Sequence, residues 1–586
     1  MQGRFGLGEA VDAGAARWVV AALLLSACSA GVSRTPAEVD AGIDLALAFS
    51  CDPPNLDCGG ACINPSTDTS NCGKCGNACT IGQMCTDGFC GCRPGVTDCG
   101  NGVCTDLQTD PLNCGECGLA CRTGEPYNET CIGGDCRTPC DADAAGNEGC
   151  SFFPVNLWST ANVGEFGVVA ANTSATDPAM VTLSDSQGKI IDRKTAPPGG
   201  LAVFRLPQDQ NKLTMTEQSV KAFHLTASRP VVAYQFHPID AALVYTGSST
   251  LLLPEYAMGR DYYVMSYTYN AGIITSPPQG QGYLAVIALE DDTLVTVTVP
   301  VATMAGGPIA ALAAKGKVTR TLKHAEVLEI TQANSLEDIS GARVHATKRV
   351  MVFGGAGTVT VPDTASGGDH IEVAMFPLST WGKHFVASKM QPRTLDDRDH
   401  YRILASRNGT HVTLTGPKGL PKLAALDAGH FVEFDTPSDF EIVADQPIFV
   451  MQYLEAWGAL NGIKLPAVTT LGDANATSII PVEQYAKRYV FYVPETYPDN
   501  FITVTADLSG KDPVQITLDG KPVAAPLLKV GTGSYGRVIL GLMPGPHLIE
   551  ANAAMELLVY GYSNYISYSY VGGGHLDIIN PNPPVQ

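Results

Sequence analysis

The chain has 586 residues, a net charge of −21 and a charged fraction of 16%, well below the roughly 25% of typical soluble domains. Nucleic-acid binding needs clustered Lys and Arg to replace counterions, so this charge balance argues against a nucleic-acid partner. The excess of acidic residues is enough to keep the chain soluble.

A short apolar run near the N-terminus is typical of a secretory signal peptide. It reads WVVAALLLSAC from Trp18 to Cys28, follows Arg4 and Arg17, and ends in small residues. A membrane-spanning helix needs about 20 apolar residues, so this run is too short to cross a bilayer. A plain cleaved signal peptide and a buried helix are the alternatives.

The end of this run, Leu25-Ser26-Ala27-Cys28, resembles the bacterial lipobox. In proteins with that motif, a peptidase cuts before the cysteine after its thiol has received a diacylglycerol group. The resemblance implies a lipoprotein signal peptide over residues 1–27, lipid attachment at Cys28 and a linker over residues 28–50. The protein is then expected in the cell envelope, anchored by lipid at the outer membrane or cell surface.

The remaining cysteines predict a disulfide framework. Removing Cys28 from the 19 cysteines leaves 18, an even number, and all of them fall between Cys51 and Cys150. Zinc ligation is the competing interpretation, but an exported chain whose Gly/Asn-rich segments carry few apolar residues is stabilised more readily by disulfides. The predicted disulfide cysteines are Cys51, Cys58, Cys62, Cys72, Cys75, Cys79, Cys85, Cys90, Cys92, Cys99, Cys104, Cys114, Cys117, Cys121, Cys131, Cys136, Cys140 and Cys150.

The cysteine spacing is duplicated. The stretch NCGKCGNAC at residues 71–79 recurs as NCGECGLAC at residues 113–121. This repeat predicts one module over residues 51–97 and a second, with a linker, over residues 98–150. Their Asn-Cys-Gly-x-Cys-Gly core resembles the cysteine-rich modules of the stigma-specific protein family. That resemblance implies an extracellular interaction or spacer module and brings no catalytic residue with it.

Residues 151–580 have the composition of an all-β region, because they lack cysteine and are rich in Val, Thr, Tyr, Phe, Gly and Pro. A proline followed four positions later by a large side chain recurs and predicts four related, sandwich-like β units of about 100–120 residues. A propeller is the alternative, but its blades are usually about 40–50 residues long. The motif copies are PVNLW at 154–158, PEYAM at 254–258, PLSTW at 377–381 and PVEQY at 481–485.

Each unit shows two alternating apolar runs around a short polar turn, which predicts a hairpin with one buried face. A further strand is expected to close each unit, beginning near His224, Arg343, Glu441 and Leu548. The predicted hairpins lie at residues 166–183, 283–299, 401–416 and 501–520.

Several motifs of the β region, in this order, resemble the IgGFc-binding protein N-terminal domain family across about residues 153–580. That resemblance implies a binding or adhesive role. The motifs are LLLPEYAMGRDYYV, GGDHIEVAMFPLSTWGKHFV, PVEQYAKRYVFYVP and the Gly/Tyr-rich LLVYGYSNYISYSYVGGG.

Catalytic motifs are absent from the sequence: it contains no His-Glu-x-x-His, Gly-x-Ser-x-Gly or Gly-Lys-[Ser/Thr] loop. The best polar cluster could act as a carboxylate pair on a glycan or as a hard-cation site, but two polar turns flanking strands are the preferred interpretation. Its members are Asp369, His370, Asp396, Asp397, Asp399 and His400. DADAAGNEG at residues 141–149 lacks the terminal acidic ligand of a calcium loop and is interpreted as a linker.

The sequence therefore predicts a surface-anchored lipoprotein that binds an extracellular protein or glycan and has no catalytic activity, cofactor or metal. A carbohydrate-active enzyme on a β scaffold is the alternative. Exposed aromatic residues are the expected ligand contacts. One candidate surface is the Tyr-rich segment that ends the β region. On a strand, however, half of these side chains would point into a core. Its tyrosines are Tyr560, Tyr562, Tyr565, Tyr568 and Tyr570.

Overall fold

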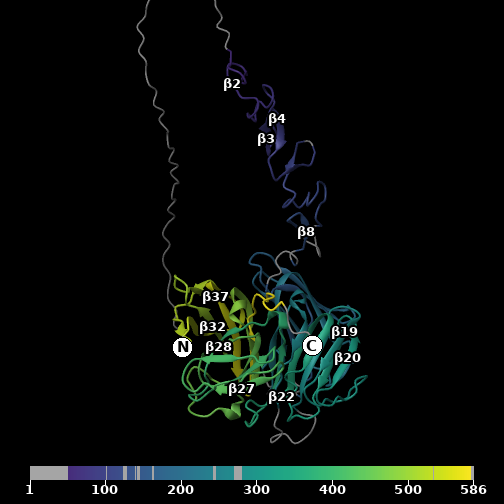
Figure 1. The fold of residues 1–586 in the computed structure, drawn as a ribbon, viewed down its shortest axis with the longest axis vertical. Helices are drawn as coiled ribbons and strands as arrows, with labels where there is room; N and C mark the ends of the chain where they lie inside the picture. Colours follow the sequence, from purple (N-terminus) through teal and green to yellow (C-terminus); the bar gives the residue numbers. More distant parts are fainter. Residues whose placement is uncertain are drawn as a thin grey trace, which may run out of the picture. The chain divides into compact units, whose positions relative to one another are not determined.

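The computed structural model describes residues 50–100, 102–122, 129–138, 140, 146–160, 164–241, 246–268, 280–531 and 533–581 (Figure 1). Cys28 and its apolar run lie outside these residues. The chain divides into one unit that ends at Gly91 and another that begins at Cys92. The predicted all-β class is confirmed. No helix within the described ranges is long and apolar enough to span a membrane.

The disulfide-rich N-terminal region is also confirmed, and its two modules repeat one pattern of bonds. The short strands of the modules pair as β1 (Leu56–Asp57) with β2 (Cys62–Ile63), β3 (Gln83–Thr86) with β4 (Phe89–Cys92), β5 (Thr97–Asp98) with β6 (Cys104–Thr105), and β7 (Thr130–Ile132) with β8 (Asp135–Arg137). The first module has the bonds Cys51–Cys62, Cys58–Cys75, Cys72–Cys85 and Cys79–Cys90. The second has Cys92–Cys104, Cys99–Cys117, Cys114–Cys131 and Cys121–Cys136.

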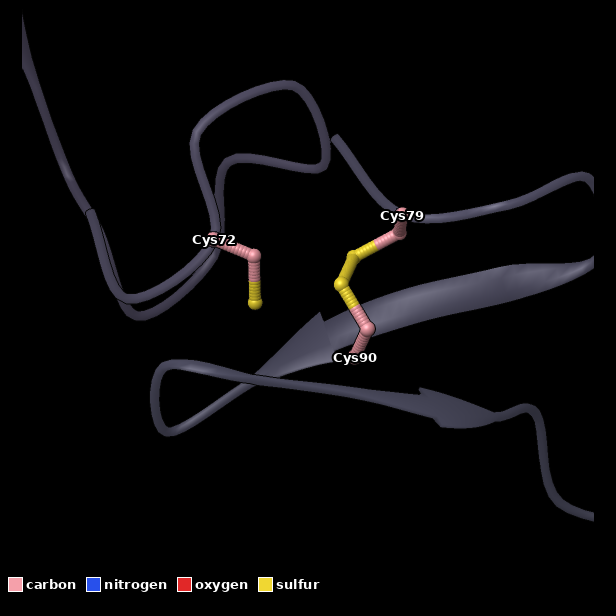
Figure 2. Close-up of side chains that lie close together, drawn as sticks. All are labelled: Cys72, Cys79 and Cys90. Carbon is pink, nitrogen blue, oxygen red and sulfur yellow. A yellow bond between two sulfur atoms is a disulfide. The ribbon is translucent and has the colours of Figure 1, made fainter. Parts of the chain in front are cut away.

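A ninth disulfide, Cys140–Cys150, ties the second module to the first strand of the β region. Figure 2 shows why the clustered cysteines are not zinc ligands: Cys79 and Cys90 are bonded to each other beside Cys72, and Cys72 is bonded to Cys85. Each such bond stabilises a small domain by about 2–4 kcal/mol, mainly by restricting the unfolded chain. This chemistry requires an oxidising compartment, so the protein is extracellular or secreted.

The first β unit is one seven-stranded sheet built on a long strand, β15, whose two halves pair with different strands. The first half of β15 pairs with β9 and β11, and its second half pairs with β10 and β16. Pro230 lies between the two halves, where no ladder partner is lost. The strands are β9 (Gly149–Phe152), β10 (Phe166–Asn172), β11 (Ala179–Asp185), β12 (Ile190–Ala196), β13 (Leu201–Leu206), β15 (Phe223–His237) and β16 (Ser248–Leu252).

The second and third units repeat this plan. In unit 3 the long strand is broken into two strands, β28 and β29, and Pro447 lies just before the second of them. Unit 2 contains β17 (Gly259–Tyr263), β18 (Gly282–Ala288), β19 (Thr293–Thr298), β20 (Lys317–Leu322), β21 (Val327–Thr331), the long strand β22 (Arg343–Val359) and β23 (Asp369–Ala374), with β14 (Glu217–Ser219) added at its edge. Unit 3 contains β24 (His384–Ala387), β25 (Asp399–Ala405), β26 (Val412–Thr415), β27 (Phe431–Thr436), β28 (Phe440–Ala444), β29 (Ile448–Leu454) and β30 (Asn475–Ile479).

Unit 4 completes the set, with β37 as its long strand. Its strands are β31 (Ala486–Val493), β32 (Asp499–Asp507), β33 (Ile516–Leu518), β34 (Lys521–Pro522), β35 (Leu528–Lys529), β36 (Tyr535–Gly541), β37 (Gly545–Ser563) and β38 (Ile566–Val571).

The predicted hairpins are wrong. The two runs of residues 166–183 form β10 and β11, but these strands do not pair with each other: β10 pairs with β13 and β15, and β11 with β12 and β15. The turn between them therefore carries the chain from the second half of β15 to its first half. The same separation holds for the runs at 283–299, 401–416 and 501–520.

The recurring proline motif marks the junction between consecutive units. Pro254, Pro377 and Pro481 cap the short 3-10 turns η1 (Glu255–Ala257), η2 (Leu378–Thr380) and η4 (Val482–Gln484). Each proline packs on a glycine of the preceding unit, namely Gly149, Gly259 and Gly382. A Cβ added at Gly149 or Gly259 would lie 2.5 Å from the proline Cβ, so only glycine fits there. The first copy, PVNLW, forms no such turn.

The four units form a ring, because their inner strands β16, β23, β30 and β38 contact one another in a closed circle. The Glu372 amide donates to Ser248 Oγ at 3.0 Å, and Ser249 Oγ donates to the Ser569 carbonyl at 3.2 Å. Ser569 Oγ donates to Asn475 Oδ1 at 2.6 Å. Side chains of all four strands enclose a cavity of only about 10 Å³, so the axis is packed core. Figure 1 shows the units gathered in this one body.

The sequence predicted one buried face for each strand of the hairpins. The ring explains why this is wrong for the first strand of three of them. Every residue of β10, β18 and β25 is buried. Val168 belongs to the hydrophobic cluster shared by units 1 and 2, whereas its neighbour Val169 belongs to the cluster that contains residues of all four units. Arg402 in β25 likewise donates to the Ser266 carbonyl of unit 2 at 2.9 Å. A neighbouring unit therefore covers the face that a free sandwich would leave in water.

Candidate binding surface

The loops that lead into the four inner strands meet at one end of the ring. Their described residues are 238–241, 246–247, 360–368, 455–474 and 564–565, and they are called the inner-strand loops below. The Gly458 amide donates to the Ser366 carbonyl at 3.1 Å, and the Gly472 amide donates to the Ser563 carbonyl at 3.0 Å. Loops fixed on a rigid scaffold in this way are the usual place for binding residues.

Two of these loops expose large aromatic side chains that contact each other. Trp457 and Tyr565 are 38% and 48% exposed. Their ring centroids lie 5.4 Å apart at an interplanar angle of 78°, which is the edge-to-face geometry that aromatic rings prefer. They are called the aromatic pair. Large aromatic side chains that are exposed to water and contact each other are typical of a contact surface.

The Trp457 backbone is held by its own loop, and its side chain lies against a neighbouring loop. The Trp457 amide donates to Asp473 Oδ1 at 3.2 Å. Gly367, at φ +106°, lies directly against the indole: a Cβ at that position would be 2.8 Å from Nε1. Glycine is needed here both for the backbone conformation and for this close approach. The loop of unit 2 therefore sets the position of the exposed tryptophan in unit 3.

Tyr565 occupies a backbone conformation that tyrosine rarely adopts. It lies in the two-residue turn between β37 and β38, with φ +60°. Glycine reaches this left-handed region without steric cost, whereas a bulky L-residue is an outlier there. A strained residue whose side chain is exposed points to function rather than to stability.

An aliphatic pair joins the loop of Trp457, which carries Ile463, to the segment before β25, which carries Leu395. Leu395 and Ile463 are 63% and 73% exposed, and the Leu395 amide donates to the Ile463 carbonyl at 3.1 Å. Thr394 and Lys464 form an isolated β-bridge beside them. Apolar side chains of this size, together with the aromatic pair, give the loops a larger apolar contact area than isolated exposed residues would.

A buried cation fixes the segment that carries Trp457 and Ile463. The Arg393 side chain is fully buried; its Nη1 donates to the carbonyls of Glu455 at 2.9 Å and Leu471 at 3.0 Å. Its Nη2 donates to Asp397 Oδ1 at 3.0 Å. Burial would raise the pKa of Asp397, but the charges of Arg393 and Lys389 outweigh that effect and lower it. Asp397 is therefore a carboxylate that orients Arg393.

Residues 248–561 match the family of the IgGFc binding protein. The chain belongs to this family. The match begins at β16 and ends within β37, so it includes Trp457 and covers most of units 2, 3 and 4. The resemblance was expected over about residues 153–580, and unit 1 shares the strand plan of the matched units.

Three solved structures align with this IgGFc-binding family member at 8% identity. They are an anti-sigma factor domain-containing protein, a second such protein from Clostridium clariflavum, and the BSP domain of a biofilm associated protein. They cover 70%, 70% and 73% of this chain and 97%, 98% and 97% of their own lengths, with TM-scores of 0.11, 0.10 and 0.11. Scores this low establish no shared fold. A search of curated proteins finds no match.

The acidic cluster predicted from the sequence is not a pair of polar turns in the IgGFc-binding fold. Asp369 and His370 begin strand β23, and Asp399 and His400 begin β25, with all four side chains buried. Asp396 alone of the six is exposed. The interpretation was wrong because these runs lie at the ring centre and at a unit interface, where a second layer of protein covers them.

These six residues do not converge on one site. Asp399 Oδ1 accepts a hydrogen bond from Lys389 Nζ at 2.5 Å, and His400 Nδ1 lies 2.7 Å from Asp435 Oδ1. The Asp369 carboxylate instead accepts the Gly247 amide. Two cavities, of about 440 and 360 Å³, are lined by other residues, including Asp439 and Lys529 in the first and Tyr256 and Ile578 in the second.

Most tyrosines of the Tyr-rich segment that ends the IgGFc-binding region lie in the core. Tyr560, Tyr562, Tyr568 and Tyr570 are at most 1% exposed, and burial raises the pKa of each hydroxyl. Tyr565 alone of the five predicted tyrosines is exposed, because it occupies the turn between the strands that carry the others.

A buried cluster of two histidines and one glutamate was missed in the sequence. His237 ends β15, and His370 and Glu372 lie two residues apart on β23, so that the latter two share one face of the strand. Burial lowers the pKa of His237 to about 4. Burial would raise the pKa of Glu372, but the two imidazoles outweigh it and lower the value to about 2. The period-2 spacing of His370 and Glu372 was the available signal.

Proposed function

We propose that this chain is an extracellular, non-catalytic binding protein of the IgGFc-binding family whose β region holds its ligand at the inner-strand loops. The observation that carries the proposal is the exposed edge-to-face pair of Trp457 and Tyr565. Trp and Tyr dominate binding energy at protein interfaces because they give a large contact area and lose little conformational entropy.

A protein ligand fits this surface better than a glycan. Ile463, on the same loop as Trp457, and its neighbour Leu395 add exposed apolar area, and aliphatic side chains offer no hydrogen bonds to sugar hydroxyls. The backbone under the surface is held by Arg393 and Asp473, so little conformational entropy is lost on binding. A glycan ligand remains the second candidate, because sugar rings also pack on exposed Trp and Tyr.

The carbohydrate-active alternative is disfavoured by the state of its proposed acids. Asp397 is ion-paired with Arg393, and Asp399 with Lys389, and all four side chains are buried. A glycosidase needs two carboxyl groups that face the sugar across a cleft, one of them able to give up a proton. Acids that are already neutralised by buried cations do not meet that need.

We expect the purified full chain to retain a ligand without changing it. An array of extracellular proteins and glycans should show saturable binding to at least one member, and a polysaccharide-release assay on the same glycans should stay at background. Saturable binding only to proteins would support the protein ligand, and binding only to glycans would support the second candidate. If the wild type releases sugar and a folded Asp397→Asn variant does not, the chain would instead be a carbohydrate-active enzyme.

The lipid anchor is a further part of the proposal, resting on Leu25-Ser26-Ala27-Cys28. If one acylated thiol holds the protein at the membrane, Cys28→Ala should move it from the membrane fraction to the soluble fraction. Cys28→Ala keeps the disulfide cysteines, so folding serves as the internal control. An unmodified mature N-terminus by mass spectrometry, or equal fractionation of both forms, would refute the anchor.

A further inference from the structure

A cluster of potential metal ligands lies between the first two units of the ring. One ligand atom each from His237, His370 and Glu372 falls within 4.8 Å of the others, and all three side chains are buried. Glu372 Oε2 is 3.2 Å from His370 Nε2 and 3.8 Å from His237 Nδ1. The strands that supply them, β15 and β23, are not paired with each other.

Hydrogen bonding within the protein pairs His370 Nε2 with Glu372 Oε2 at 3.2 Å but leaves His237 Nδ1 unpaired. Glu372 Oε1 accepts from Gln235 Nε2 at 3.0 Å, which orients the carboxylate and turns Oε2 toward the imidazoles. His237 Nδ1 has no hydrogen-bond partner, because 3.8 Å is too long for a hydrogen bond to Oε2. A buried nitrogen left unpaired is costly, and this one faces a carboxylate oxygen.

The charge of the cluster is also uncompensated. Among the described residues, the ion pairs of Glu372 are with His237 and His370 alone, and no Lys or Arg joins them. Lys212 contacts the cluster through Ser159: Lys212 Nζ donates to Ser159 Oγ, which lies 3.5 Å from His237 Nε2. A buried carboxylate usually has a paired cation or a coordinated metal ion.

We propose that His237, His370 and Glu372 bind one divalent transition-metal ion of the Zn²⁺ class and so tie unit 1 to unit 2. Zn²⁺ takes imidazole nitrogen and carboxylate oxygen at about 2.0–2.2 Å, which places tetrahedral ligands about 3.4 Å apart. The distances of 3.2 and 3.8 Å from Oε2 bracket that value. Ser159 Oγ then orients the His237 ring from its other nitrogen, as the outer partners of metal-bound histidines do.

The ion would act as a structural link rather than a catalytic centre. Its ligands come from two units, and a metal ion bound only by the folded chain stabilises that state by mass action. The cysteine clusters cannot substitute for this site, because every cysteine in them is disulfide-bonded.

The test is metal content and thermal stability of the full chain produced with Zn²⁺ in the medium. We expect about one zinc ion per chain by elemental analysis, and a melting temperature that falls by at least about 5 °C with a chelator and recovers when Zn²⁺ returns. Glu372→Gln should lose the zinc, since it removes the anionic ligand while keeping an amide at the position. His411→Gln, which changes a histidine that is 74% exposed, should keep it.

Replacement by Co²⁺ gives a second measurement that does not depend on a variant folding. The wild-type chain should show the visible absorption bands of tetrahedral Co²⁺ with two nitrogen ligands. Less than about 0.1 zinc per chain together with no Co²⁺ bands would overturn the proposal and leave a hydrogen-bonded triad. Equal zinc in the wild type and a folded Glu372→Gln variant would place the ion elsewhere and would also overturn it.

Discussion

Asp397→Ala is expected to lower the free energy of unfolding by about 3–5 kcal/mol, because it leaves buried charge without its partner. Arg393 would lose both its side-chain hydrogen bonds to the carboxylate, and Lys389 would lose a charge 3.7 Å away. Neither cation can reach water, since their side chains are 0% and 2% exposed. Chemical denaturation of the full chain, followed by tryptophan fluorescence, measures the change.

Asp396→Ala is the matched control, because it removes the adjacent carboxylate, which is exposed. Surface substitutions of this kind usually change stability by less than about 0.5 kcal/mol. Equal effects of the two variants would show that Arg393 does not depend on Asp397. An Asp397→Ala chain of unchanged stability would contradict the structural role and return this carboxylate to the list of possible catalytic groups.

The ring could be predicted only in part, and the proline motif shows why. The spacing of Pro254, Pro377 and Pro481 divides the β region into units, because each proline opens a turn at a junction. The glycine that receives each proline is distant in sequence, and nothing local identifies it. Knowing that units repeat therefore does not reveal that they close into a ring.

Strand pairing was mispredicted for a related reason. Runs such as residues 166–183 have the alternation and turn of a hairpin, and local pattern alone favours pairing of neighbours. The long strand β15 arrives about 40 residues later and pairs with both runs, so that each pairs with β15 instead of with the other. Alternation reports which residues are buried, but it does not tell which strand lies beside them.

The candidate surface was found from the sequence only through Tyr565, as one of five tyrosines. Neither the positive φ of Tyr565 nor the exposure of Trp457 leaves a periodic signal, since both residues lie in loops. Composition pointed to aromatic contacts, but choosing between core and surface needed the ring. For Asp397 the sequence pointed to a site that the structure does not contain. Its position in an acidic cluster suggested acid/base catalysis or cation binding, but the fold pairs it with Arg393.

Removing the aromatic pair is expected to abolish most of the binding while leaving the fold intact. Truncating interface aromatics at a hot spot costs at least about 2 kcal/mol, which is roughly 30-fold in Kd. Tyr565→Gly removes the ring at a residue with φ +60°, where glycine relieves backbone strain and should stabilise the turn slightly. Trp457→Ala removes the partner ring, and the double variant tests the pair together.

Tyr256→Ala provides the control, since it removes another exposed aromatic residue, 41% exposed, at the opposite end of inner strand β16. The deciding measurement is the Kd of the full chain, the Trp457→Ala/Tyr565→Gly variant and Tyr256→Ala for the ligand found on the array, with circular dichroism of each. We predict that the double variant, folded, binds at least about 30-fold more weakly than the wild type, whereas Tyr256→Ala binds equally well. A folded double variant with unchanged Kd would contradict a binding function at the inner-strand loops.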